Sequence, residues 1–197
     1  MKGVILNLFE DFVVAAHGED RWDAVLARAP EHVRGVILAP AMYPRAWFDE
    51  LLAAACAELN VEREALLRAF GASAFDGLVQ RYPALAARFG DSKVMLHGIG
   101  PLVQIEVIKL SPGEKPPRIV CDDVQDGSLQ LILASMPGLC SMVEGLLDGL
   151  GDWFGDDIAR THRLCERRGS NHCELTLRIA RRPGAVAKRP GSGVRAA

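Results

Sequence analysis

The chain has 197 residues, of which 49% are hydrophobic, so it suits a single domain with a sizeable core and a tail. Its formal net charge of −2 argues against a nucleic-acid partner, and no apolar run reaches the roughly 18 residues that cross a membrane. The start of the chain lacks the long apolar region of a signal peptide, and the cysteine count of five is odd, so we expect a cytoplasmic protein with reduced thiols.

The first half of the chain predicts helices, because apolar residues recur at three- and four-residue spacing and prolines separate the runs. The first helix is marked by apolar residues that share one face: Val4, Ile5, Leu8, Phe9, Phe12 and Val13. Further helices are expected at residues 21–29, 45–60 and 61–82.

The stretch from Ser92 to Leu110 is also apolar, but three residues interrupt it. Gly98 and Gly100 lower helix propensity, and Pro101 removes a backbone hydrogen bond from the helical ladder. We therefore expect a broken helix in this stretch.

The second half changes character after the double proline at Pro116 and Pro117. Residues 118–124 and 128–135 predict two strands joined through Asp126-Gly127, a strong hairpin signal. A helix over residues 140–154 and a last strand over 172–180 follow. The fold class is therefore α+β, with a helical part (1–90) packed on a mainly antiparallel sheet with helices (91–180). Residues 181–197, rich in proline, glycine and basic residues, predict a disordered tail.

One stretch, "HRLCERRGSNHC", gathers residues that bind metals. His162, Cys165 and Cys173 would be brought together if the intervening loop closes a hairpin. Zinc needs four such ligands, and the fourth is either Cys140 or His172, although His172 would point to the opposite face of a strand from Cys173. Two alternatives stay open: ordinary reduced cysteines, or a disulfide between Cys165 and Cys173 on oxidation.

Several short stretches, taken in order, resemble one known family. They are "MKGVILNLFEDFV", Trp22, "NVEREALLRAFG", "RYP", and "PPR" before two strands and a helix. Together they resemble the haem nitric oxide/oxygen binding (H-NOX) domain, from Met1 to about Ile179. The resemblance implies a helical subdomain packed on an antiparallel sheet, with haem between them. It also implies a regulatory sensor rather than an enzyme, acting on a signalling protein such as a histidine kinase or a cyclic-dinucleotide enzyme. A homodimer is left open.

Two motifs of that family are altered here. The family's iron-ligating histidine lies thirteen residues before the second proline, a position held by Gln104, whose amide oxygen is a poor iron ligand. Of the Tyr-x-Ser-x-Arg motif that holds the haem propionates, only Ser135 remains, because Leu133 and Pro137 replace the tyrosine and the arginine. We therefore expect a haem-independent sensor, although haem stays open through a non-standard axial ligand such as His97, two helical turns before Gln104.

The resemblance also assigns two sets of residues. Some bacterial members carry zinc in a pattern that matches Cys140, His162, Cys165 and Cys173, which favours Cys140 over His172 as the fourth ligand. Whether that zinc is structural or redox-sensing stays open. The positions that match the family's pocket are Ile5, Phe9, Val103, Gln104, Val107, Pro117, Leu133, Ser135 and Pro137. An apolar ligand or the side chains themselves would fill this pocket.

Overall fold

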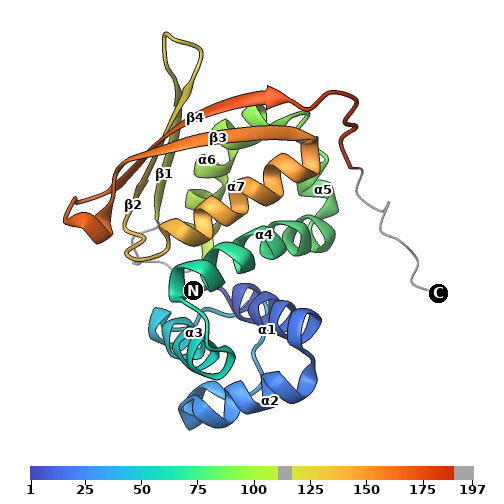
Figure 1. The fold of residues 1–197 in the computed structure, drawn as a ribbon, viewed down its shortest axis with the longest axis vertical. Helices are drawn as coiled ribbons and strands as arrows, with labels where there is room; N and C mark the ends of the chain where they lie inside the picture. The colour runs from blue at the N-terminus through green and yellow to red at the C-terminus, as the bar shows by residue number, and fades with distance from the viewer. Residues whose placement is uncertain (111–116, 189–197) are drawn as a thin grey trace.

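The protein is described here by a computed structural model that covers residues 1–110 and 117–188, apart from the side chains of Leu85 and residues 103–110. Figure 1 shows helices α1 to α3 gathered at one end of the molecule and the sheet at the other, with α4 and α7 stacked between them. The helical elements are α1 (Gly3–His17), α2 (Glu19–Arg28), η1 (Glu31–Val33), α3 (Arg45–Leu59), α4 (Arg63–Arg81), α5 (Pro83–Ala86), α6 (Ser92–Leu110), α7 (Cys140–Phe154) and η2 (Glu166–Arg168).

The helices at the N-terminal end surround a buried aromatic cluster. Phe9 of α1 is fully buried, and its ring centroid lies 5.1 Å from that of Phe70, 5.5 Å from Phe48 and 6.2 Å from Trp22. These rings come from α1 to α4 and meet mostly edge to face, the arrangement that aromatic quadrupoles favour. The helices predicted from the apolar spacing in this half are confirmed.

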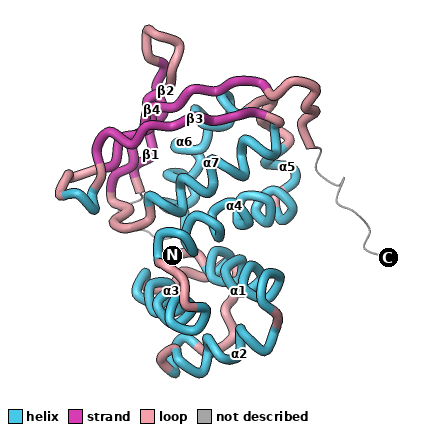
Figure 2. Tube along the Cα trace, in the orientation of Figure 1, coloured by secondary structure: helices cyan, strands magenta, loops and turns pink. Residues whose placement is uncertain are grey.

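The sheet has four antiparallel strands in the order β1-β2-β4-β3. Their bounds are Arg118–Asp123 (β1), Leu129–Ala134 (β2), Asp156–Leu164 (β3) and Cys173–Arg181 (β4). On β2 the leucines at 129, 131 and 133 are buried and the residues between them are partly exposed, so one face of the sheet is apolar. Figure 2 shows α7 lying along the sheet, where its buried residues share a second core with β2 and β4.

The stretch from Ser92 to Leu110 forms one helix, α6, so the prediction of a broken helix is wrong. The two glycines allow close packing and do not end the helix. A Cβ atom on Gly100 would lie 2.1 Å from the carbonyl oxygen of Ile119 in β1, and one on Gly98 would lie 2.5 Å from the ring of Phe89. Pro101 removes a single hydrogen bond, which the rest of the ladder tolerates.

Close packing of α4 and α7 joins the two parts of the fold. A Cβ atom on Gly71 of α4 would lie 2.1 Å from the carbonyl oxygen of Met142, and one on Gly145 of α7 would lie 2.0 Å from that of Arg68. Only glycine fits at such distances, so the two backbones are in direct contact. The pair therefore acts as one rigid layer between the aromatic cluster and the sheet.

The chain remains packed beyond residue 180, where we expected the tail to begin. The backbone N–H of Arg182 donates to Gly155 O at 3.0 Å, and that of Lys188 donates to Trp153 O at 2.7 Å. The guanidinium of Arg182 also pairs with Asp152 and Asp157. The tail prediction therefore missed residues 182–188, which the end of α7 holds, while residues 189–197 lie outside the described part. None of the helices in the described ranges combines the length and hydropathy that a membrane crossing requires.

Candidate metal centre

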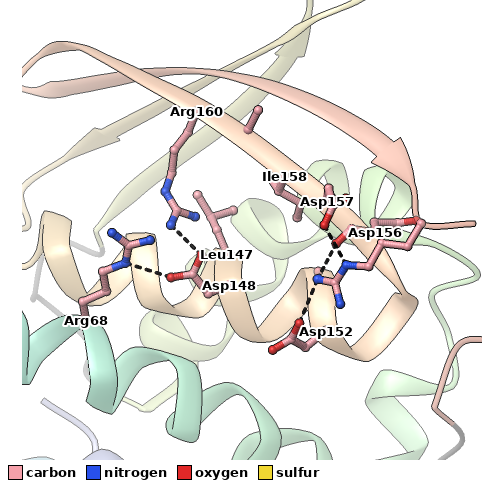
Figure 3. Close-up of a pocket in the computed structure, with 11 residues that line it drawn as sticks. Arg68, Leu147, Asp148, Asp152, Asp156, Asp157, Ile158 and Arg160 are labelled. Carbon is pink, nitrogen blue, oxygen red and sulfur yellow. Dashed lines mark hydrogen bonds and ion pairs between the residues drawn. The ribbon is translucent and has the colours of Figure 1, made fainter. Parts of the chain in front are cut away.

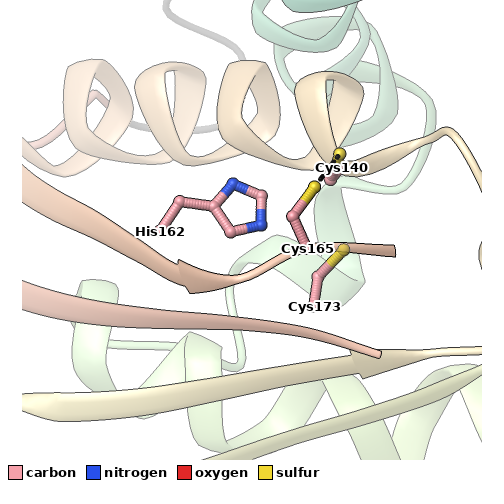
Figure 4. A group of neighbouring side chains, drawn as sticks. All are labelled: Cys140, His162, Cys165 and Cys173. Carbon is pink, nitrogen blue, oxygen red and sulfur yellow. Dashed lines mark hydrogen bonds between the residues drawn. The ribbon is translucent and has the colours of Figure 1, made fainter. Parts of the chain in front are cut away.

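Four potential metal ligands meet where α7 begins and the β3–β4 hairpin turns. Cys140 is the first residue of α7, His162 lies near the end of β3, Cys165 follows that strand, and Cys173 is the first residue of β4. Their ligand atoms all lie within 4.8 Å of one another (Figure 4), and the three cysteines are buried. The structure therefore brings together the set of four residues that the sequence predicted.

Local backbone geometry explains the convergence of the two hairpin cysteines. The turn between them contains η2 and then Gly169, whose φ of 89° falls in the left-handed region that favours glycine. Within this turn, the N–H groups of Arg168 and Ser170 both donate to Cys165 O, at 2.9 and 3.2 Å. The N–H of Glu166 also donates to the Cys173 sulfur at 3.4 Å. The turn thus places the two sulfurs side by side, as the hairpin prediction required.

The spacing of the sulfurs fits a tetrahedral ion. Cys140 Sγ and Cys165 Sγ are 3.9 Å apart, and all three cysteines are free thiols. Zinc–sulfur bonds of about 2.3 Å in a tetrahedron place two sulfurs about 3.8 Å apart. The two thiols therefore stand at the separation that zinc requires.

His162 presents the correct nitrogen to the cluster. Its Nδ1 lies 3.0 Å from Glu144 Oε1, and since a carboxylate only accepts hydrogen bonds, Nδ1 is the nitrogen that carries the proton. Its Nε2 is buried and has no hydrogen-bond partner among the described residues. A buried nitrogen with a free lone pair is costly unless something binds it, and a metal ion would do so.

The thiols differ in how readily they ionise. Burial raises the pKa of Cys173 to about 12, and burial also raises the pKa of Cys140 despite the nearby Arg167 guanidinium. Burial acts in the same direction on Cys165, but hydrogen bonds from the Arg167 backbone and side chain and from the other two thiols outweigh it and lower the pKa. Cys165 is therefore the thiol that ionises first when no ion is bound.

His172, the rejected fourth ligand, lies away from the cluster. Its Nδ1 is 2.5 Å from Asn171 Oδ1, and its Nε2 is 4.0 Å from a carboxylate oxygen of Glu174.

Sequence reasoning missed two residues that lie beside the cluster, Glu144 and Arg167. Glu144 could have been predicted from the sequence, because a residue four positions after Cys140 on a helix lies on the same face as Cys140.

Comparisons with known proteins agree with this architecture. Residues 2–162 match the family described as Haem-NO-binding, HNOB. The H-NOX domain from Shewanella oneidensis, solved in the Fe(II)CO state, is 30% identical with a TM-score of 0.80, over 91% of this chain and 99% of that one. This chain belongs to the H-NOX family. A search of curated proteins found no match.

Two more distant H-NOX structures show the same fold. The Fe(II) unliganded protein from K. algicida is 22% identical with a TM-score of 0.79, over 94% of this chain and all of that chain. An oxygen-binding H-NOX domain related to soluble guanylate cyclases is 16% identical with a TM-score of 0.78, over 96% and 100%. H-NOX domains are sensor domains and not enzymes, so the prediction of a non-enzyme is confirmed.

The three positions that match the family's propionate motif hold one hydroxyl group, that of Ser135, and no tyrosine or arginine. Leu133 is buried in the sheet core, while Ser135, with a φ of 63°, and Pro137 are exposed. The Pro137 carbonyl accepts a hydrogen bond at 3.0 Å from Arg45, and the next carbonyl accepts one at 3.0 Å from Arg63. The residues present at the motif therefore do not fit the way in which the family holds haem.

The other predicted pocket residues differ in how deeply they are buried. Phe9 belongs to the aromatic cluster, and Ile5 and Pro117 are half-buried. Val103, Gln104 and Val107 lie on α6, in the range whose side chains are outside the described part.

His97, the alternative axial ligand, contacts the sheet. Its Nδ1 lies 2.8 Å from Cys121 O in β1, and its Nε2 lies 3.5 Å from Asp123 Oδ2. The Nε2 of His97 is buried and makes no hydrogen bond among the described residues. A haem role for His97 stays a prediction.

A charged hollow of about 550 Å³ runs between α4, α7 and β3 (Figure 3). Asp148 lies between two arginines there, at 2.9 Å from Arg68 and 2.5 Å from Arg160, and Arg182 bridges Asp152 and Asp157. The charges pair with one another across elements. This pattern indicates a structural ion-pair network and offers no pair of carboxylates for catalysis within the hollow.

Proposed function

We propose that this H-NOX domain is a haem-independent sensor whose responsive site is a zinc-binding Cys3His cluster. The observation that carries the proposal is the buried, unpartnered Nε2 of His162 facing three buried thiols within 4.8 Å, all among the described residues. Three sulfurs and one imidazole nitrogen form a donor set that zinc prefers, and four protein ligands leave no open position for substrate. The site therefore supports a role in structure and sensing.

Zinc bound in this cluster would tie the start of α7 to the β3–β4 hairpin, since its ligands come from both.

Two of the cysteine sulfurs in the cluster can also react with an oxidant. Oxidation by hydrogen peroxide would join two of the sulfurs as a disulfide, either Cys165 to Cys173, as predicted from the sequence, or Cys140 to Cys165, whose sulfurs are 3.9 Å apart. The two zinc-bound thiolates lose two electrons. Hydrogen peroxide takes up these electrons and two protons from solvent and becomes two molecules of water, and the ion loses two of its ligands. A structural zinc site would in this way respond to the redox state.

Independence from haem is supported by residue chemistry at both anchor sites. Gln104 stands where the family has its iron-ligating histidine, and Leu133 and Pro137 supply no side-chain donor where the family holds the propionates. The pocket positions that remain are mostly apolar and would suit an apolar ligand or packed side chains.

The output of such a sensor would pass to a signalling protein. Relatives in this family act with partners such as histidine kinases or cyclic-dinucleotide enzymes, and we extend this to the present domain. Reduced, buried cysteines suit a cytoplasmic location.

Metal analysis tests the zinc assignment directly. Protein purified without added metal should hold one zinc per chain, and Cys165→Ser should lose it and melt at a lower temperature. Cys56→Ser is the matched control, because Cys56 lies on α3 outside the cluster. Equal zinc content in the Cys165→Ser variant would overturn the assignment.

A second candidate function is a haem-based sensor of nitric oxide or oxygen that uses His97 as a non-standard axial ligand. It is favoured by one observation: the Nε2 of His97 is buried and has no hydrogen-bond partner among the described residues. If this function holds, the His97→Ala variant should lose a haem absorption band that the unmodified protein shows.

A further inference from the structure

Arg167 connects the metal site to helix α4. It lies on η2, between the ligands Cys165 and Cys173, and its Nη1 donates to Glu64 Oε1 at 2.7 Å in the first turn of α4. The Arg167 guanidinium also acts to lower the pKa of the Cys140 and Cys165 thiols, so its charge lies close to both sulfurs. One side chain therefore links the candidate metal site to a helix that lies 103 residues earlier in the sequence.

The neighbouring residue on α4 makes a second connection. Arg63 donates to Gly138 O at 3.0 Å, two residues before the ligand Cys140, and to Asp49 Oδ1 of α3 at 2.9 Å. The first turn of α4 is thus held by η2 and by the loop that precedes α7, and it is also bound to α3. Beyond this turn, the glycine contacts between α4 and α7 leave little freedom for either helix to slide.

The charge of the cluster makes the interaction of Arg167 depend on whether a metal ion is bound. Zinc with three thiolates and a neutral imidazole carries a net charge of about −1, which Arg167 is placed to balance. A disulfide is neutral, so oxidation and loss of the ion would leave Glu64 as the remaining anionic partner of Arg167. An exposed arginine–glutamate pair alone orders its neighbours weakly, and these two side chains are 37% and 47% exposed.

We infer that Arg167 is a positioning residue that transmits the state of the metal site to the first turn of α4 through Glu64. The inference rests on the proposed zinc site. With metal bound, Arg167 is fixed between the sulfurs and Glu64, and the first turn of α4 is ordered. Without metal, that turn loosens, and the signal reaches α3 through Arg63 and Asp49.

Hydrogen–deuterium exchange on peptides that cover residues 62–68, with zinc content measured on the same samples, tests the inference. In the unmodified protein, removal of zinc by a chelator should speed exchange in this segment by about threefold to tenfold. In Arg167→Gln, exchange should be fast already and should not change on zinc removal, while zinc still binds at one per chain. Arg163→Gln removes a neighbouring charge that pairs with Glu174 instead, and should behave like the unmodified protein.

Each result is decisive. A metal-dependent change that persists in Arg167→Gln would overturn the role of Arg167. Zinc-loaded unmodified protein with no change on metal removal would overturn the coupling and leave the zinc site standing. Absence of zinc from the unmodified protein would overturn the proposed function and the inference together.

Discussion

Glu144 decides which nitrogen of His162 faces the three cysteines. The two residues lie on α7 and β3, with Oε1 and Nδ1 3.0 Å apart, and both side chains are mostly buried. Carboxylates that orient a ligating histidine fix its tautomer and raise its basicity as a ligand. The carboxylate therefore belongs to the metal site even though it contributes no ligand atom.

Replacement of Glu144 should weaken zinc binding. We expect Glu144→Ala to lower zinc affinity by about 10- to 100-fold, measured by competition with a chromogenic chelator. Glu144→Gln should lose less, because its amide oxygen still accepts from Nδ1. Glu50→Ala removes another carboxylate paired with a histidine, His32, at 2.8 Å and far from the cluster, so it should leave the affinity unchanged. Equal affinities for Glu144→Ala and Glu50→Ala would contradict the role.

Sequence reasoning identified the four residues that the structure brings together, but it could not identify the residues around them. The ligands are visible in the sequence because cysteine and histidine are few and the spacing matches a family pattern. The contact of Arg167 with Glu64 spans 103 residues and depends on how η2 meets α4, which no local pattern encodes.

At the level of elements, α7 is held to both of its neighbours by Asp148. This carboxylate pairs with Arg68 of α4 and with Arg160 of β3, whose side chain is only 13% exposed. Burial acts to raise the pKa of Asp148, but the hydrogen bonds from the two guanidinium groups outweigh it and hold the pKa below its ordinary value. The ionised form therefore stabilises the fold.

The contribution of Asp148 should depend on pH. Because the pKa is lower in the folded than in the unfolded state, the stabilisation is present above about pH 4 and is lost as the pH falls through the folded-state pKa. Asp148→Asn should lower the free energy of unfolding at pH 7 by about 0.5–1 kcal/mol, measured by urea denaturation. The difference should shrink as the pH falls below about 4, the ordinary pKa of an aspartate, and disappear once the pH is below the lower folded-state pKa.

The matched control for this prediction is Asp23→Asn, since Asp23 is exposed on α2. A loss of stability in Asp148→Asn that is the same at pH 3 and pH 7 would show that packing, and not the charge, accounts for it.

Elements that follow apolar periodicity were predictable from the sequence, and those set by tertiary contacts were less so. The buried leucines of β2 alternate in the sequence as they do in the sheet. The break expected in α6 was wrong because Gly98 and Gly100 lie against Phe89 and Ile119, contacts that the sequence does not display. The sequence of residues 182–188 does not display the two backbone hydrogen bonds, from Arg182 to Gly155 and from Lys188 to Trp153, that hold this segment against the end of α7.

At the scale of the whole molecule, the chain keeps the H-NOX fold, and we propose that the residues which hold the cofactor in that family have changed. The aromatic cluster, the α4–α7 layer and the antiparallel sheet match haem-bound relatives at a TM-score of 0.80 over 91% of the chain. By the family resemblance, Gln104, Leu133 and Pro137 stand where the family has its histidine, tyrosine and arginine. Of these, Leu133 packs in the sheet core and Pro137 is exposed.

The most direct test of haem independence is the absorption spectrum of protein purified from haem-supplemented cells, followed by titration with haem. The S. oneidensis H-NOX protein, solved in the Fe(II)NO state, serves as the positive control. We predict no sharp Soret band at one haem per chain, only the broad absorption of loosely adsorbed haem. A sharp, stoichiometric Soret band that is lost in His97→Ala would contradict haem independence and establish this domain as a haem-based gas sensor.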